Sequence, residues 1–403
     1  MSILENKRIL LGVTGSIAVY KAADLASKLR QAVAEVDVIL TKAAAQFVSP
    51  LTFQSVTGRR AYTEADLWGN EGHVLHIGLA QEADMMLIAP ATANTMAKLA
   101  HGRADNLLSL SALAAECQLL VAPAMDGGMY HNPATQENIE TLKKRGVVVI
   151  GPAEGHLASG LKATGRMVEP AALVGHIRLA LGKDGALAGR KIVVSAGGTR
   201  EAIDPVRYLG NRSSGRQGFA LAQAALDLGA QVTLVAGPSW LETPVGAERV
   251  EAVSAEEMRA AVLGAVDGAD ALLMAAAVAD YRPEKTAKEK IKKGKGIPEI
   301  KLTATKDILQ EVAKIKEKKG FPKVTVGFAA ESQDLLKNAE NKLKAKKLDL
   351  IAVNDISAED AGFEVETNQV TLLGADGSKE ELPLMGKDEV AEAILERVVR
   401  LLE

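Results

Sequence analysis

The sequence predicts an α/β protein built from two doubly wound, Rossmann-like domains in tandem. Short apolar runs of strand length alternate with segments whose apolar residues recur at helical spacing. This alternation stops once, near residues 183–190, and then begins again. A chain of 403 residues, 47% of them hydrophobic, is long enough for two separate cores. We therefore expect a first domain over 1–182, a linker over 183–190 and a second domain over 191–403.

Five buried strands are expected in the first domain. Their apolar runs are RILLGV (8–13), EVDVIL (35–40), DMMLIAP (84–90), QLLVAPAM (118–125) and GVVVIGP (146–152). The segments between these runs carry apolar residues with helical periodicity. Strands that alternate with helices in this way are typical of a parallel sheet covered by helices on both faces.

The second domain repeats this architecture after the stretch LGKDGALAGR (181–190), which is rich in glycine and has no periodicity. Its expected strands are RKIVVSAGG (190–198), QVTLVAGP (231–238), ALLMAAAVAD (271–280), KVTVGFAAE (323–331) and LDLIAVND (348–355). Residues 362–384 are expected to form a β-hairpin appended to the second sheet. Residues 387–403 have the pattern of an amphipathic helix.

Composition excludes several classes of function. A net charge of −3 and a pI near 6.2 offer no overall attraction for nucleic acid or an anionic membrane. Cys117 is the one cysteine, so no intrachain disulfide can form, and its apolar surroundings favour a packing role. The apolar run at 271–279 is far shorter than the roughly 20 residues that span a bilayer. We expect a cytoplasmic protein with neither a nucleic-acid nor a membrane partner.

A first candidate phosphate site lies in GVTGSIAVYKAADL (12–25). The stretch lacks the G-x-G-x-x-G spacing of dinucleotide sites, which argues against an NAD-dependent oxidoreductase. The N–H groups of Gly15, Ser16 and Ile17 and the Ser16 hydroxyl would still lie at a helix N-terminus, which suits one phosphomonoester. A purely structural turn remains the alternative.

Polar residues also follow two other strands of this domain. Thr41 ends EVDVIL, and Thr92 and Asn94 follow DMMLIAP. Ligands of open α/β sheets bind at the carboxyl ends of the strands, so these side chains are candidate ligand contacts.

Three stretches resemble the conserved blocks of the flavin-dependent cysteine decarboxylases, and among these the phosphopantothenoylcysteine decarboxylases. They are HIGLAQEADMMLIAPATAN beginning at His76, PAMDGGMYHNPATQENI (123–139) and GHLASGLKATGRM (155–167). The resemblance implies a flavodoxin-like flavoprotein domain and makes His76 the proton-transferring base. It also implies bound FMN, with cofactor contacts from Gly15, Ser16, Ile17, Thr41, Thr92, Asn94 and Met125.

Two residues depart from the usual pattern of that family. Asp126 replaces an asparagine, and Ser159 replaces a reactive cysteine. A carboxylate facing a substrate carboxylate is repelled unless one of them is protonated, and a serine is a poorer proton donor than a cysteine. We favour a matched variant with the same outcome, in which His156 assists Ser159. The alternatives are an altered or lost decarboxylase activity, or a flavin-binding regulatory protein without turnover.

The second domain opens with SAGGTREAIDPVRYLGNRSSGRQG (195–218), a glycine turn and polar cluster before a helix. Main-chain N–H groups, serine hydroxyls and arginines together form an anion site of higher capacity than the first. A solvated polar loop is the alternative. All six histidines precede residue 183, so this domain works without an imidazole.

This string resembles the signature of the phosphopantothenate–cysteine ligases, and further matches follow in the same order. The resemblance implies that Lys290 stabilises charge on the α-phosphate of a nucleotide and that Asn211 polarises the acyl-nucleotide carbonyl. Asp280 is also a candidate Mg²⁺ ligand. The lysine-rich stretch 285–306 is interpreted as a flap over a triphosphate, a solvated charged face being the alternative. The implied nucleotide and substrate contacts are Arg207, Ser213, Ser214, Gly215, Ala275, Ala276, Asp280, Lys306, Asp307, Ile308, Phe328, Lys342 and Lys346.

Together the two resemblances predict two consecutive steps of coenzyme A synthesis in one chain. A nucleotide-dependent ligase domain would join 4′-phosphopantothenate to cysteine, with CTP as co-substrate and Mg²⁺ as metal. The flavin domain would decarboxylate the product to 4′-phosphopantetheine. The resemblance to these two families further implies a homo-oligomer, with trimeric flavin domains and dimeric ligase domains.

Overall fold

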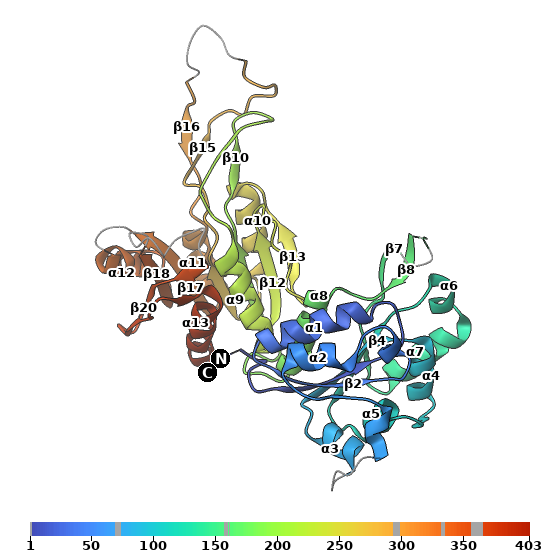
Figure 1. Cartoon of the computed structure of the whole chain (residues 1–403). Coiled ribbons are helices and arrows are strands. Elements are labelled where there is room, and N and C mark those ends of the chain that lie inside the picture. The colour runs from blue at the N-terminus through green and yellow to red at the C-terminus, as the bar shows by residue number, and fades with distance from the viewer. Residues whose placement is uncertain are drawn as a thin grey trace. The chain divides into compact units, whose positions relative to one another are not determined.

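The computed structural model describes residues 2–68, 74–156, 160, 162–292, 299–331, 335–355 and 366–403. The chain divides into two compact units, Met1–Leu181 and Gly182–Glu403. Each unit contains one large sheet with helices packed on it (Figure 1). The predicted fold class, two doubly wound α/β units, is confirmed.

The sheet of the first unit is entirely parallel, in the order β3-β2-β1-β4-β5-β6. Its strands are β1 (Arg8–Val13), β2 (Glu35–Leu40), β3 (Ala61–Tyr62), β4 (Met85–Ala91), β5 (Gln118–Pro123) and β6 (Val148–Val149). All five strands predicted for this domain are present, although β6 is only two residues long. Without β3 the order is that of flavodoxins, and the short edge strand β3 extends it to the Rossmann order 3-2-1-4-5-6.

Both faces of this sheet are buried. Leu11 of β1 belongs to the core on one face, with Val36 and Leu87, whereas Leu10 belongs to the core on the other face. Successive strand residues point to opposite faces, so burial on both sides explains the continuous apolar runs. The helices of the unit are α1 (Val19–Gln31), α2 (Pro50–Thr57), α3 (Leu75–Gln81), α4 (Ala93–Ala100), α5 (Leu107–Ala114), α6 (Gly127–Tyr130), α7 (Pro133–Lys144) and α8 (Pro170–Gly182).

The second unit has an eight-stranded sheet in the order β13-β12-β9-β14-β17-β18-β20-β21. Its first six strands are parallel: β13 (Glu248–Glu251), β12 (Gln231–Ala236), β9 (Lys191–Ala196), β14 (Ala271–Met274), β17 (Val324–Glu331) and β18 (Leu350–Asp355). The antiparallel strands β20 (Val370–Gly374) and β21 (Lys379–Glu381) form the predicted hairpin on β18. The helices are α9 (Arg216–Asp227), α10 (Ala255–Ala265), α11 (Ile308–Lys319), α12 (Leu335–Ala345) and α13 (Lys387–Leu402).

The described residues also form four two-stranded ribbons whose pairings were not expected from the sequence, because their residues lack an apolar alternation. They are β7 (Ala153–His156) with β8 (Lys162–Arg166), β10 (Arg200–Ala202) with β11 (Tyr208–Gly210), β15 (Tyr281–Pro283) with β16 (Leu302–Ala304), and β19 (Thr367–Asn368) with β22 (Met385–Gly386). Strand β19 lies within the range 362–384 expected as a hairpin, but it pairs with β22. Within the second unit, β10, β15 and β16 extend away from the large sheet (Figure 1).

Residues 183–190 pack onto the second unit. Leu187 is buried, and its N–H donates to the carbonyl of Leu228 at 2.8 Å. A Cβ on Gly185 would lie only 2.6 Å from that same carbonyl oxygen. The glycine content of this stretch therefore permits a close backbone approach to the turn after α9.

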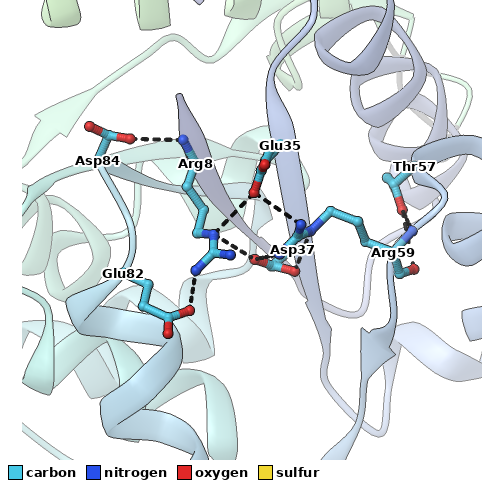
Figure 2. A network of polar contacts seen from close by, with 7 residues as sticks. All are labelled: Arg8, Glu35, Asp37, Thr57, Arg59, Glu82 and Asp84. Atoms are coloured by element: carbon cyan, nitrogen blue, oxygen red, sulfur yellow. Dashed lines mark hydrogen bonds and ion pairs between the residues drawn. The ribbon is translucent and has the colours of Figure 1, made fainter. Parts of the chain in front are cut away.

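Charged residues link the amino-terminal parts of β1, β2 and β4 (Figure 2). Arg59 forms a bidentate pair with Asp37, with Nε–Oδ1 and Nη2–Oδ2 distances of 2.8 and 3.0 Å. Arg59 also donates to Glu35 at 3.0 Å, and the Arg8 N–H donates to Asp84 at 2.8 Å. This network stabilises the edge of the sheet opposite the carboxyl ends of the strands.

Candidate functional site

Both sheets reverse their strand order between the first and fourth strands of the unit, at β1/β4 and at β9/β14. The carboxyl ends of the strands at such a point form the usual ligand crevice of an open α/β sheet. In the first unit, buried Thr14 joins these ends. Its hydroxyl donates to the carbonyl of Pro90 at 2.7 Å and accepts from the Thr92 N–H at 3.0 Å.

A cavity of about 520 Å³ lies beside this point. It is lined by Ser16, Ile17, Ala18, Tyr20, Lys21, Ala124, Met125, Asp126, His156, Gly165, Arg166 and Met167. Four predicted site residues are among them: Ser16, Ile17, Met125 and Asp126.

Other predicted cofactor contacts do not line this cavity. The Thr92 hydroxyl caps α4 by accepting from the Thr95 N–H at 3.3 Å, and the Thr41 hydroxyl accepts from the Ala44 N–H at 3.3 Å. Asn94 is exposed in the first turn of α4. Gly15, next to Ser16, is also outside the lining. The two threonines thus have local structural roles.

The start of α1 provides donors for an anion. No side chain caps this helix, and the nearby Ser16 hydroxyl accepts from the Ala18 N–H at 3.3 Å. Lys21, only 4% exposed, donates to the carbonyl of Met167 at 3.0 Å and to Glu169 at 2.8 Å. The Lys21 ammonium is the main reason why the pKa of Glu169 lies below its usual value. Lys21 therefore ties α1 to the chain that follows β8.

Asp126 is the N-cap of α6, and its Oδ1 accepts from the Gly128 N–H at 2.9 Å. The preceding residue, Met125, donates its N–H to the carbonyl of Gly165 at 3.0 Å. A Cβ at Gly165 would lie 2.2 Å from the Met125 carbonyl oxygen, so β8 approaches this loop too closely for a side chain. His156 of β7 lines the same cavity. Ser159 lies outside the described residues.

His76 lies elsewhere in the first unit. It is in α3, which packs against α5, whereas β7 and β8 lie at the other end of the unit in Figure 1. His76 does not line the cavity. Its Nδ1 atom is buried and has no hydrogen-bond partner among the described residues.

The second unit has a cavity of about 290 Å³ at its own switch point, where α9 begins. The predicted residues that line it are Asn211, Ser213, Ser214, Gly215, Ala275, Ala276, Phe328 and Lys342. The helix has no side-chain cap, and the Ser213 hydroxyl accepts from the Gly215 N–H at 3.3 Å. Asn211 donates from Nδ2 to the carbonyl of Val278 at 3.1 Å, which joins this loop to the end of β14.

Sequence reasoning missed five polar residues of this cavity: Arg216, Gln217, Asn354, Asn368 and Lys387. Lys387 is 6% exposed, and burial, followed by the nearby charge of Arg216, holds its pKa below the usual value. The one available signal in the sequence was a lysine at the start of the amphipathic helix 387–403. Only the return of the chain after β18 brings Asn368 and Lys387 to α9.

Arg207 and Lys290 lie outside the cavity but belong to one structural cluster. Buried Asp204 accepts from Arg207 Nε at 2.9 Å and from the Ile291 N–H at 3.1 Å. Arg207 also donates to the Ile291 carbonyl at 2.8 Å. The Arg207 guanidinium is the main cause that holds the pKa of Asp204 far below its usual value. The pair thereby anchors the chain beside Lys290, whose side chain is exposed.

The remaining predicted contacts are dispersed. Asp280 is exposed, and Lys306 lines a separate charged cavity of about 550 Å³. Asp307 caps α11 by accepting from the Gln310 N–H at 3.2 Å, and its carboxylate also lies 3.2 Å from Lys346 Nζ. Ile308 is buried in the core. Within the described ranges, no cluster of three or more His, Cys, Asp or Glu side chains could hold a metal ion.

Comparisons with known proteins match both units. The family model described as Flavoprotein matches residues 2–181, and that of the DNA/pantothenate metabolism flavoprotein C-terminal domain matches 187–402. The coenzyme A biosynthesis bifunctional protein CoaBC of Bacillus subtilis is 45% identical over 401 residues, 99% of this chain and 98% of the relative. This chain belongs to the CoaBC family. The CoaBC protein of Mycobacterium tuberculosis is 42% identical over 408 residues, covering 98% of this chain and 97% of the relative.

Solved structures resemble each unit separately. The crystal structure of the C-terminal domain of a CoaBC protein is 38% identical and covers 54% of this chain and 98% of that chain, with a TM-score of 0.46. The FMN binding protein AtHal3 is 34% identical and covers 43% of this chain and 96% of that chain, with a TM-score of 0.39.

Membership of the CoaBC family makes this chain a bifunctional enzyme of coenzyme A biosynthesis, with a flavoprotein decarboxylase domain followed by a ligase domain. The family resemblance inferred from the sequence motifs is thus confirmed. None of the helices in the described ranges has the length and apolar character needed to cross a bilayer.

Proposed function

We propose that the second unit condenses 4′-phosphopantothenate with cysteine through an acyl-cytidylate made from CTP. The first unit then uses FMN to decarboxylate 4′-phosphopantothenoylcysteine to 4′-phosphopantetheine. One observation carries this assignment: each unit has its own cavity where an uncapped helix begins at the switch point of its sheet. Such a helix start binds phosphate, and FMN and every substrate except cysteine carry one.

The residues of the first cavity fit FMN. Its volume of about 520 Å³ lies within the usual range for cofactor sites. Ser16 and the first N–H groups of α1 suit a single phosphate, while Ile17 and Met125 provide apolar contact. When bound, FMN supplies a two-electron oxidation of the thiol end of the substrate, and the oxidised group can accept the electron pair that remains when CO₂ leaves.

The contact made by Asp126 supports the matched variant, in which the decarboxylase is active, over the alternative in which this activity is lost. Its Oδ1 accepts from the Gly128 N–H, a role that the usual asparagine fills equally well through its own Oδ1. The loop at Met125 is therefore held in place with either residue. In this proposal Asp126 orients the substrate, and Ser159, assisted by His156, delivers the proton.

We also propose that a neighbouring copy supplies His76, since His76 does not line the cavity of its own unit. Apolar residues on either side of residues 69–73 are exposed: Trp68 is 89% and Val74 59% accessible. Their burial against another copy would stabilise the trimeric arrangement that the family resemblance implies.

Mixed oligomers test this shared site. Chains with His76→Asn and chains with Asp126→Ala should each fail to release CO₂, yet their co-expression should restore part of the release. A hybrid site would then combine the cavity of one chain with the histidine of the other. If co-expressed chains stay inactive while both retain flavin and ligase activity, the shared site is wrong.

In the ligase unit, positioning and charge replace acid–base catalysis. Lys290 and Lys342 neutralise the charge that builds on the phosphates, and Asn211 polarises the acyl carbonyl in the second half-reaction. We propose that Mg²⁺ enters with the triphosphate, with Asp280 as a protein contact. Chelation with EDTA should then stop pyrophosphate release without removing flavin; unchanged release would exclude the metal.

Pairing of the ligase units is supported by the exposed apolar residues of the ribbons. Tyr208 and Leu209 lie in β11, Val206 lies in the segment between β10 and β11, and Tyr281 and Leu302 lie in the β15/β16 ribbon. All five are exposed. We propose that these ribbons bury against a second copy. A solution mass equal to one chain of 42.4 kDa would contradict both interfaces.

The complete reaction tests the overall function. Purified protein supplied with 4′-phosphopantothenate, cysteine and CTP should release pyrophosphate and CO₂ in equal amounts and produce 4′-phosphopantetheine. The rival with an inactive flavin domain predicts pyrophosphate without CO₂ and accumulation of 4′-phosphopantothenoylcysteine. Ser159→Cys measured in parallel shows whether the serine limits the decarboxylation.

A further inference from the structure

Two asparagines of the ligase cavity, Asn354 and Asn368, have a buried Oδ1 atom and no assigned role, and the contacts of Asn368 show which way its amide faces. Asn368, in β19, lines the cavity and is only 5% exposed. Its Oδ1 atom has no hydrogen-bond partner among the described residues. A buried acceptor without a partner is unfavourable, so a group of this kind beside a cavity points to a ligand that donates to it.

The neighbouring hydrogen bonds determine which way the Asn368 amide faces. The carbonyl of Lys387 can only accept, and Gln217 donates to it from Nε2 at 3.2 Å. Gln217 must therefore present Oε1 to Asn368, which donates to it from Nδ2 at 3.3 Å. This chain of two amides leaves Oδ1 of Asn368 as the free acceptor, and a flipped amide would break the contact with Gln217.

The rest of the cavity wall restricts the ligand. Gln217 lies in the first turn of α9, whose uncapped N-terminus presents N–H donors for a phosphate. Apolar residues that line the same cavity include Ala276, Val278 and Phe328. A matching ligand combines a phosphate ester, an apolar portion and a hydroxyl donor a few bonds from the phosphate.

We propose that Asn368 is a substrate-binding residue of the ligase, accepting a hydrogen bond from a substrate hydroxyl through Oδ1, and that Gln217 is the positioning residue that orients it. This inference rests on the proposed ligase function. Two substrates present the required chemistry, 4′-phosphopantothenate through the hydroxyl of its pantoyl part and CTP through its ribose. A hydroxyl-to-amide hydrogen bond of ordinary strength corresponds to about a tenfold change in affinity.

Substrate analogues combined with Asn368→Ala identify the hydroxyl. The variant should raise KM about tenfold for the substrate whose hydroxyl it binds and leave kcat nearly unchanged. The analogue that lacks this hydroxyl, either the deoxy form of 4′-phosphopantothenate or a deoxy-CTP, should have the same KM with wild type and variant. The substrate whose deoxy analogue has the same KM with wild type and with Asn368→Ala is the one that supplies the hydroxyl.

Further variants separate recognition from folding. Asn368→Asp keeps an oxygen at Oδ1 but cannot donate to Gln217 Oε1, so Asn368→Asp and Gln217→Leu should both lose discrimination against the deoxy analogue, as Asn368→Ala does. Gln223→Ala, on α9 but outside the ligase cavity, is the matched control and should change neither KM.

Two different failures are distinguishable. If wild type releases no pyrophosphate, the proposed ligase function is wrong. If wild type is active but Asn368→Ala leaves both KM values unchanged, or still distinguishes each substrate from its deoxy analogue as wild type does, the role of Asn368 is wrong.

Discussion

At the scale of single residues, Asp204 shows how one buried carboxylate positions a distant segment. It accepts from three main-chain N–H groups, those of Val206, Arg207 and Ile291, and pairs with the Arg207 side chain. The sequence resemblance assigned Arg207 to the substrate. In the structure its guanidinium instead bonds Asp204 and the Ile291 carbonyl, which places it one residue from Lys290.

We predict that Asp204→Asn weakens this anchor, because a neutral amide cannot accept as many hydrogen bonds or pair with Arg207. Pyrophosphate release should fall by up to about a hundredfold, the usual cost of misplacing a reacting group by about an ångström. CO₂ release from added 4′-phosphopantothenoylcysteine should be unaffected. Asp267→Asn, at an exposed pair with Lys319, serves as the control and should behave as wild type.

A second residue-scale prediction concerns the network of Figure 2. The side chain of Asp37 is 7% exposed, and Arg59 holds both of its oxygens. Arg59→Met leaves this carboxylate without its main partner, which should lower the free energy of unfolding of the first unit by about 3 kcal/mol. Urea denaturation followed by flavin release measures the change.

The exposed pair Lys28–Asp24 on α1 is the matched control for that experiment. Lys28→Met should shift the free energy of unfolding by less than about 0.5 kcal/mol, because exposed pairs contribute little. Equal effects of the two variants would show that the network at Arg59 is no stronger than a surface ion pair.

At the scale of elements, the ligase site depends on two segments that enter from different places. Asn211 precedes α9 and lines the cavity, whereas Lys290 follows β15 and is held near the β10/β11 ribbon by the Asp204–Arg207 pair. Because the two residues belong to separate elements, their substitution should affect separate half-reactions.

We predict that Lys290→Gln blocks pyrophosphate release, since the charge on the α-phosphate then lacks its cation. Asn211→Asp should still release pyrophosphate but accumulate the acyl-cytidylate, because a carboxylate cannot donate to the acyl carbonyl. Quenched single-turnover reactions analysed for both products distinguish the steps. An Asn211 variant unable to release pyrophosphate would reverse its assignment to the second half-reaction.

At the scale of the whole molecule, carboxylates with lowered pKa values make both units sensitive to acid. Burial acts to raise the pKa of Asp84 in the first unit, yet the Arg8 N–H and the Lys7 ammonium outweigh it and lower the pKa. Asp270 in the second unit is likewise lowered, since burial is outweighed by the Lys191 N–H, Lys323 and Arg190.

A carboxylate with a lowered folded-state pKa stabilises the protein above its unfolded pKa, near 3.9, and loses this contribution as pH falls through the folded value. We therefore predict that the urea midpoints of both units fall below about pH 4. Asp270→Asn should lower the midpoint of the second unit at pH 7 and flatten its decline in acid. An unchanged pH profile would mean that Asp270 does not contribute.

The sequence contained most of the fold. The continuous apolar runs of β1, β4, β9 and β14 are buried on both faces of a sheet, which leaves a strong local signal. The ribbons β7/β8 and β10/β11 were missed because their short, polar strands are stabilised by partners distant in sequence rather than by burial of one face.

By itself the sequence determined the two-unit α/β architecture, the CoaBC family and the residues around the two uncapped helix starts, because these depend on local periodicity and on contiguous motifs. Only the tertiary structure decided which residues share a cavity. It places Asn368 and Lys387 beside α9 because the antiparallel strand β20 turns the chain back from β18, and it leaves His76 outside the cavity of its own unit. Contacts between segments more than 150 residues apart leave no trace in local spacing, since their geometry depends on how the whole sheet is ordered.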